Sequence, residues 1–99
     1  MSVFDEAKSQ LAQAAKVLRL SAKTLESLQT PHRVISKTLK ITMDNGKPAT
    51  FAAYRSQHNN YLGPYKGGIR FHPNVSEDEV KALSLWMSFK TGVAGIPYG

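Results

Sequence analysis

Cysteine is absent from this sequence of 99 residues, so it contains neither a disulfide bond nor a thiolate metal site. No stretch approaches the roughly 20 apolar residues of a membrane-spanning helix, and we expect no membrane partner. The N-terminal stretch MSVFDEAKSQ carries Asp5 and Glu6 and lacks the apolar run of a secretory signal. Together these absences favour a cytoplasmic location.

Acidic residues are also scarce. Seven Asp and Glu stand against 13 Lys and Arg, which gives a formal net charge of +6. Such an excess of positive charge favours an anionic partner. The cations are nevertheless spread singly along the chain, and no block of like charges marks an interaction tail. Because a nucleic-acid footprint is a clustered patch or stripe, we prefer a solvated basic surface and expect no nucleic-acid partner.

Three helices are indicated by pattern and by capping residues. Apolar residues at helical spacing predict an amphipathic helix over residues 3–18. Ser21 is placed to cap a second, short helix that reaches about Leu28. A third helix is predicted from Ser76, where SEDE matches the capping box. Its residues 80–93 are apolar on nearly all sides, so we expect a buried helix that a partner chain or further sequence must cover.

Between the helices the apolar period changes to two. Alternation over residues 34–43 predicts a half-buried strand with its apolar side chains at Ile35, Leu39, Ile41 and Met43. Asp-Asn-Gly supplies a tight turn, a return strand is expected over about 49–57, and a further strand is suggested at 68–71. The fold class we predict is α/β in an α+β-like form: N-terminal helices, a mixed sheet begun by a hairpin, and a buried helix from about residue 76.

Most catalytic and metal-binding patterns are missing. The three histidines have no metal-ligand spacing, no serine lies in a G-x-S-x-G elbow, and the acids cluster only at the cap of the third helix. We therefore predict no metal site and no nucleophile. The P-loop spacing G-x-x-x-x-G-K-[ST] is also absent.

Two lysines have unusual neighbours. Lys66 lies in GPYKGG, between a proline and two glycines, and Lys90 lies near the end of the apolar helix. A buried ammonium group is costly unless it meets an anion, which makes both lysines candidate anion ligands. The simpler alternatives are an ordinary glycine turn around Lys66 and, for Lys90, a side chain that reaches solvent from the helix end.

The segments GPYKGGIRFHP, EVKALSLWMSFK and GIPYG follow one another over residues 63–99. This string closely resembles the N-terminal, substrate-binding and oligomerising domain of the glutamate dehydrogenase family. The family pattern has G-P-x-K-G-G-I-R-[FYW]-H-P, then a helix that ends in W-M-[ST]-[FW]-K, then P-Y-G-G-G-K-G-G. A looser match runs back through PHRVISKTLKITMDNG.

The resemblance implies a role for each matching residue. Lys66 would hold the side-chain carboxylate of glutamate, Lys90 would hold the α-carboxylate, and Met87 would line the pocket. Gly67 and Gly68 would let the backbone approach the substrate. Related dehydrogenases that act on leucine, phenylalanine or valine have an apolar residue where Lys66 stands, so lysine favours a dicarboxylate. A structural role is implied for the other motif residues, Arg70, Phe71 and His72.

The resemblance also implies a reaction: the reversible oxidative deamination of L-glutamate to 2-oxoglutarate and ammonia, with NAD or NADP, by a homo-oligomer that is hexameric in intact relatives. The family's catalytic lysine would lie beyond Gly99, and the nucleotide-binding Rossmann domain would follow. We therefore expect residues 1–99 to be part of the substrate-binding and oligomerisation domain, without catalytic or cofactor-binding residues, and inactive alone. The alternative is a stand-alone module that binds dicarboxylates or assembles with subunits. The segment does not discriminate NAD from NADP.

Overall fold

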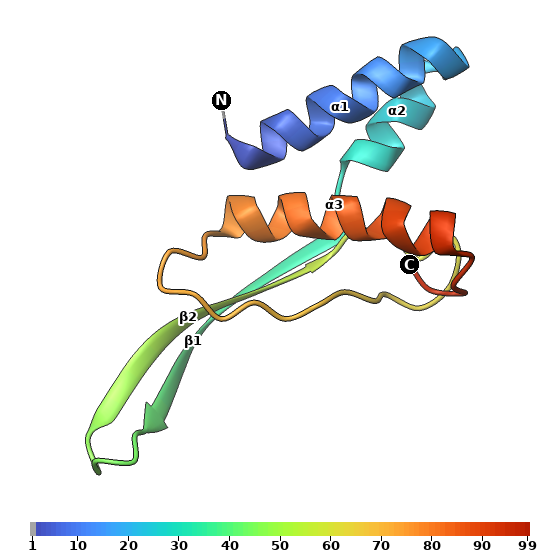
Figure 1. Ribbon diagram of the computed structural model, residues 1–99. Helices are drawn as coiled ribbons and strands as arrows, with labels where there is room; N and C mark the ends of the chain where they lie inside the picture. Colours follow the sequence, from blue (N-terminus) through green and yellow to red (C-terminus); the bar gives the residue numbers. More distant parts are fainter. Residues whose placement is uncertain (1) are drawn as a thin grey trace.

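The computed structural model describes residues 2–99, which form three helices and a two-stranded sheet (Figure 1). The elements follow in the order α1 (Val3–Leu18), α2 (Ala22–Gln29), β1 (Arg33–Thr42), β2 (Pro48–Gln57) and α3 (Glu77–Ala94). The predicted fold class, N-terminal helices with a hairpin and a later helix in an α+β-like arrangement, is confirmed. None of the helices in residues 2–99 is long and apolar enough to cross a membrane.

Each helix begins after a serine whose hydroxyl accepts a backbone N–H three residues on, in the pairs Ser2–Asp5, Ser21–Thr24 and Ser76–Glu79. These bonds satisfy donors that the first helical turn leaves without partners. The caps predicted at Ser21 and Ser76 are therefore confirmed. The end of α3 is set by Gly95, which has a φ of 71° and donates its N–H to carbonyls of the last turn.

Strands β1 and β2 form an antiparallel hairpin whose register runs from Arg33 opposite Gln57 to Thr42 opposite Pro48. Gly46, with a φ of 79°, closes the turn by donating its N–H to Met43 over 2.8 Å. In the described residues this hairpin is the whole sheet, so the expected mixed sheet is represented by two antiparallel strands. The strand suggested at 68–71 is wrong, because that stretch makes no ladder.

Helix α3 packs on one face of the hairpin, and α1 packs in turn on α3 (Figure 1). The hydroxyl of Ser84 in α3 donates to that of Ser56 in β2 over 2.7 Å. Successive strand residues point to opposite faces, and the register puts Leu39 opposite Phe51 on the other face. Leu39 is 48% exposed and Phe51 is 45% exposed. The alternation thus predicted the strand correctly, but its apolar side faces away from α3, and of the predicted apolar residues only Ile35 is half-buried.

The hydrophobic core lies between α1 and α3, and its buried side chains are Ala7, Leu11, Ala82 and Leu85. Two long-range hydrogen bonds fix the pairing of these helices. The Asp78 carboxylate accepts the backbone N–H of Phe4 over 3.1 Å, and the Trp86 indole donates to the side chain of Gln10 over 3.1 Å. Only part of α3 is buried as predicted, since Phe89 and Val93 are exposed in the described residues.

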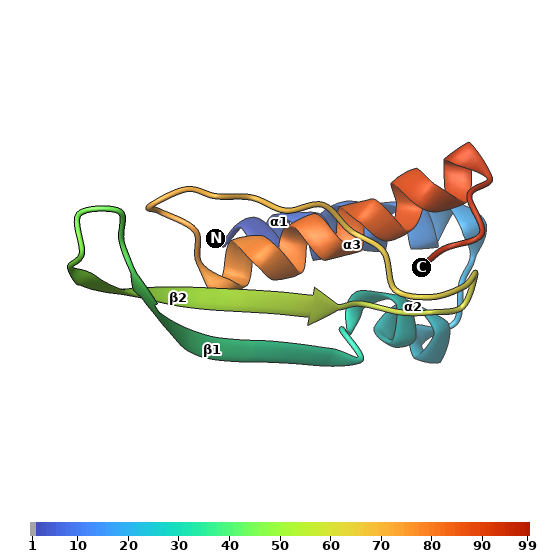
Figure 2. The same ribbon diagram turned by 90° about the horizontal axis from the view of Figure 1, so that it is seen from below.

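The segment that joins β2 to α3 runs back along α3, so that its first residues lie near the end of that helix (Figure 2). An ion pair ties its far end to the start of the helix: Arg70 Nε lies 3.2 Å from Glu79 Oε1. The capping-box glutamate is thus used to hold the connecting segment. This contact supports the structural role expected of Arg70.

Candidate functional site

Two glycine-containing stretches, residues 63–66 and 97–99, pack against one another; we call them the motif junction. The backbone N–H of Gly99 donates to the carbonyl oxygen of Pro64 over 2.8 Å. A Cβ atom added to Gly99 would lie 3.4 Å from the backbone nitrogen of Lys66. The C-terminal GIPYG segment therefore lies against the backbone of GPYKGG, next to the candidate lysine. Segments that belong to one site are expected to lie side by side in this way.

The motif junction requires glycine for steric reasons. A Cβ atom on Gly63 would overlap the carbonyl group of Pro97, and the φ of Gly63 is 150°, a conformation that side chains disfavour. A Cβ atom on Gly99 would lie 2.7 Å from the carbonyl oxygen of Asn59, which real side chains do not tolerate. The two stretches approach this closely because neither position carries a side chain.

Lys66 and the two glycines that follow it lie on the outer side of the junction. Lys66, Gly67 and Gly68 are all exposed, and a Cβ atom on either glycine would meet nothing within 4 Å. Space beside this backbone is what a close approach by a substrate requires. The substrate-binding roles expected of these three residues remain predictions.

The other candidate residues belong to the last turns of α3. Met87 is half-buried and Lys90 is exposed, and their spacing of three residues puts them on one helix face. The next turn touches the connecting segment, because a Cβ atom on Gly92 would lie 3.5 Å from the Leu62 side chain. The fold thus brings the helix end that carries Lys90 beside the start of the segment that carries Lys66.

Sequence patterns missed a group of polar side chains next to this site. The imidazole of His32 lies 2.9 Å from the Tyr65 hydroxyl, and the Tyr61 hydroxyl lies 2.7 Å from that of Ser27. His32 and Tyr65 are 33 residues apart in the sequence, and Ser27 and Tyr61 are 34 residues apart. No local spacing could have revealed them, since only the fold brings α2, the residue before β1 and the connecting segment together.

The imidazole of His58 is buried, with 3% of the residue exposed. Its Nε2 lies 2.6 Å from the carbonyl oxygen of Leu28, so this nitrogen carries the proton and donates it. The other ring nitrogen is buried without a partner in the described residues. Burial lowers the pKa of His58 below its ordinary value; the bond to Leu28 opposes this shift, and the nearby His32 adds to it.

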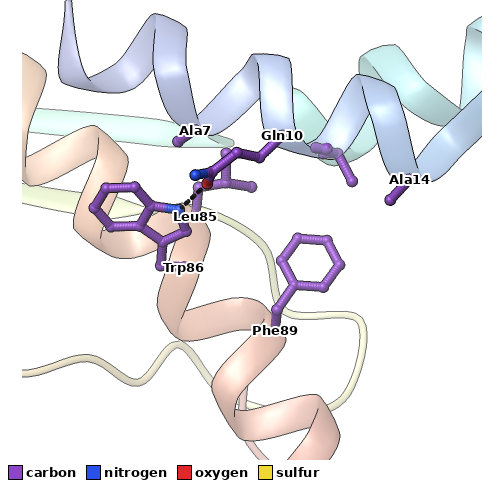
Figure 3. Close-up of a pocket in the computed structure, with 7 residues that line it drawn as sticks. Ala7, Gln10, Ala14, Leu85, Trp86 and Phe89 are labelled. Carbon is purple, nitrogen blue, oxygen red and sulfur yellow. Dashed lines mark hydrogen bonds between the residues drawn. The ribbon is translucent and has the colours of Figure 1, made fainter.

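An apolar pocket of about 220 Å³ lies elsewhere, between Ala7 and Ala14 of α1 and Trp86 and Phe89 of α3 (Figure 3). The side chain of Gln10 spans its rim to bond the Trp86 indole. No charged residue lines it. Such a pocket does not suit a dicarboxylate, because a buried anion needs a cationic or hydrogen-bonding partner.

Residues 2–99 were compared with the features that metal and dinucleotide sites require. No group of three or more His, Asp or Glu side chains gathers there. A dinucleotide-binding site needs parallel strands joined by a helix, with a glycine-rich turn after the first strand. The only strands described form an antiparallel hairpin. We assign no residue of this part of the chain to NAD or NADP.

Comparison with known proteins places the chain in a class of amino-acid dehydrogenases. Residues 31–99 match the family model described as Glu/Leu/Phe/Val dehydrogenase, dimerisation domain. The chain therefore belongs to this dehydrogenase family, as its motifs indicated. The match contains both lysines and the whole motif junction.

Within that class, the chain is similar to glutamate dehydrogenases. It is 52% identical over 99 residues to the NAD-specific glutamate dehydrogenase of Clostridioides difficile, covering 100% of this chain and 24% of the relative. It is 54% identical over 96 residues to the NADP-specific glutamate dehydrogenase A1 of Halobacterium salinarum, covering 97% and 23%. Relatives of both nucleotide types are thus about equally similar.

The solved structures that resemble this chain are also glutamate dehydrogenases. The glutamate dehydrogenase of Peptoniphilus asaccharolyticus matches with a TM-score of 0.92 at 44% identity, covering 100% of this chain and 25% of that one. The hetero-hexameric glutamate dehydrogenase of Thermus thermophilus matches at 0.89 and 36% identity, covering 98% and 23%. The chain thus spans about a quarter of the length of the relatives it matches.

Replacing Gly63 by alanine should open the motif junction, because the new methyl group would overlap the carbonyl of Pro97. We expect a loss of about 1–3 kcal/mol in the free energy of unfolding, as for other overpacked sites. Limited proteolysis should also cut the C-terminal segment faster. Gly67→Ala is the matched control and should change neither, since a Cβ atom there meets nothing within 4 Å. Equal behaviour of the two variants would contradict this account.

Acid should destabilise the fold through His58. Because the pKa of this residue is lowered in the folded state, the unfolded chain binds the proton more readily. The free energy of unfolding should therefore decrease as the pH falls below about 6.5, the ordinary value for histidine. Urea titrations of His58→Gln should show a weaker dependence between about pH 5 and pH 7. His72→Gln, at an exposed site, should keep the full dependence; an unchanged slope in His58→Gln would contradict the assignment.

Proposed function

We propose that residues 1–99 are the glutamate-anchoring part of an NAD(P)-dependent glutamate dehydrogenase, and that they form part of its substrate-binding and oligomerisation domain. The observation that carries this proposal is the motif junction. Gly99 bonds to Pro64, two residues before Lys66, while the last turns of α3 bring Lys90 to the same end of the molecule. Family membership and the names of the relatives support the reaction class.

In this proposal the two lysines hold the two carboxylates of one substrate. Lys66 takes the side-chain carboxylate of glutamate or 2-oxoglutarate, and Lys90 takes the α-carboxylate. Bonds between ammonium and carboxylate groups are roughly twice as strong as neutral ones, and two of them fix both ends of the molecule. Met87 lines the pocket on the face of Lys90, and Gly67 and Gly68 leave the backbone accessible to the substrate.

The parent reaction is the reversible oxidative deamination of L-glutamate to 2-oxoglutarate and ammonia. NAD or NADP would supply the hydride acceptor, and which of the two is used remains open, since relatives of both types match. The chain's own contribution is to bind and orient the dicarboxylate. We further propose a cytoplasmic enzyme that assembles as a homo-oligomer of six subunits. The Thermus relative, a hetero-hexamer, supports the number of subunits.

A second candidate function is subunit assembly or dicarboxylate binding without catalysis. It is favoured by large apolar side chains that the described residues leave uncovered: Ile69 is 85% exposed, Phe71 is 93% exposed and Val93 is 90% exposed. Apolar surface of this kind marks contacts with other protein surfaces. The two candidates share the lysine site and differ in whether catalysis is coupled to it.

Substituting the lysines tests the anchoring roles. Lys66→Leu should weaken binding of L-glutamate by about 1.5–3 kcal/mol, since a hydrogen bond between charged groups is lost. L-Norvaline, which has a methyl group in place of the distal carboxylate, should bind the variant as well as it binds the parent. Lys90→Leu should weaken the binding of both L-glutamate and L-norvaline, because both carry an α-carboxylate. Isothermal titration without cofactor gives the dissociation constants.

Lys81→Leu is the control for these variants, because Lys81 lies on the same helix and its ammonium group pairs with Glu77 at the surface, 3.5 Å away. It should bind both amino acids normally. Unaltered glutamate binding by Lys66→Leu would refute the assigned role of Lys66.

A polypeptide of residues 1–99 should show no glutamate-dependent reduction of NAD or NADP. Groups that position a substrate give binding, while turnover also needs the groups that place the hydride acceptor and transfer protons. Formation of the reduced nicotinamide, followed by its absorbance, is the measurement, with an intact glutamate dehydrogenase as the positive control. Turnover by the purified polypeptide would show that the expectation is wrong.

A further inference from the structure

We infer that His32 is a positioning residue for Lys66 and acts through the side chain of Tyr65, so that a hydrogen bond outside the substrate site helps to select dicarboxylates. This inference rests on the proposed role of Lys66. It concerns residues on separate elements: His32 lies just before β1, and Tyr65 lies in the connecting segment.

The His32 ring lies between two tyrosines. Its Nδ1 is 2.9 Å from the Tyr65 hydroxyl, and its Nε2 is 3.4 Å from the Tyr61 hydroxyl. Both rings stand nearly perpendicular to the imidazole, at 88° for Tyr65 and 78° for Tyr61. The Tyr61 hydroxyl continues to Ser27 of α2 over 2.7 Å. Both nitrogens of the ring therefore face hydroxyl oxygens.

In this arrangement the His32 ring nitrogens and the two tyrosine hydroxyls can all form hydrogen bonds at the same time. A neutral imidazole has one donor nitrogen and one acceptor nitrogen. When Tyr65 donates to Nδ1, the proton on Nε2 points at Tyr61, and the Tyr61 hydroxyl is free to donate to Ser27. Bonds that run in one direction polarise one another and strengthen the chain. The Tyr65 hydroxyl is thereby linked to α2 through His32.

His32 is itself held by the buried part of the molecule. Its backbone N–H donates to the carbonyl oxygen of His58 over 2.8 Å. The His58 ring, of which 3% of the residue is exposed, donates to Leu28 at the end of α2 over 2.6 Å. The imidazole that meets Tyr65 therefore extends from a fixed support.

Fixing Tyr65 fixes the start of the Lys66 side chain. Tyr65 and Lys66 share one peptide group, so holding the Tyr65 side chain against His32 restrains the backbone from which the Lys66 side chain extends. Gly99 packs against the same peptide, close to the Cα atom of Tyr65 and the nitrogen of Lys66. A lysine has a long, flexible side chain, and its reach to a bound carboxylate depends on where its backbone is held.

Tyr65→Phe tests the inference, because it removes the hydroxyl and keeps the ring. The substitution should weaken L-glutamate binding about threefold to tenfold, as the loss of one hydrogen bond does. Isothermal titration of the whole protein that contains these residues gives the dissociation constants. L-Norvaline binding should not change, since that ligand has no distal carboxylate. His32→Ala should behave alike, and the double variant should lose no more than either single one.

Tyr61→Phe is the matched control. It makes the same chemical change on the neighbouring tyrosine, whose contact with His32 is longer and which is not adjacent to Lys66. Because its contact with His32 is longer, 3.4 Å against 2.9 Å, its glutamate affinity should fall clearly less than that of Tyr65→Phe. Equal losses in Tyr61→Phe and Tyr65→Phe would overturn the inference, as would a Tyr65→Phe variant that loses glutamate and norvaline to the same extent.

The outcome for Lys66→Leu separates this inference from the proposed function. If Lys66→Leu loses glutamate selectively and Tyr65→Phe does not, the anchoring role stands and the positioning role of His32 is refuted. If Lys66→Leu binds glutamate normally, the proposed function fails, and the inference fails with it.

Discussion

The close backbone approach at the motif junction is the constraint on which the candidate site depends. Gly63 and Gly99 allow two stretches more than thirty residues apart to touch through their main chains, where a Cβ atom on either would collide with a carbonyl group. Because of that contact, the backbone that leads into Lys66 is held against the C-terminal segment. Side chains at these positions would move the lysine without altering its chemistry.

Helix α3 connects this junction to the rest of the fold. It packs on α1 through Leu85, meets β2 through Ser84, and holds the connecting segment through the ion pair of Glu79 with Arg70. These contacts leave the surface around Phe89 and Val93 uncovered. A helix that is apolar nearly all round therefore has three neighbours inside the described residues, and its remaining apolar surface suits contacts with other protein surfaces.

Local signals in the sequence predicted most of the elements, because caps, turns and periodicity depend on neighbouring residues. The helix from Ser76 and the turn at Gly46 were found in this way. Which face of the hairpin is covered could not be found, since that depends on where α3 lies. The buried His58 and the His32 contact were missed for the same reason. The candidate lysines were singled out by their neighbours in the sequence, and their expected roles came from a family resemblance that spans the junction.

Position 65 is left open in the family pattern, although it lies between the glycine that shapes the junction and the lysine that follows. An open position is where one chain can differ from another without disturbing the backbone contact. Here a tyrosine fills it, and its hydroxyl meets an imidazole whose own support is a buried histidine. The glycines thus determine how closely the segment approaches, while Tyr65 and His32 determine how firmly it is held. The position of the backbone and the restraint on its movement are separate requirements for a lysine that must reach one carboxylate of a small substrate.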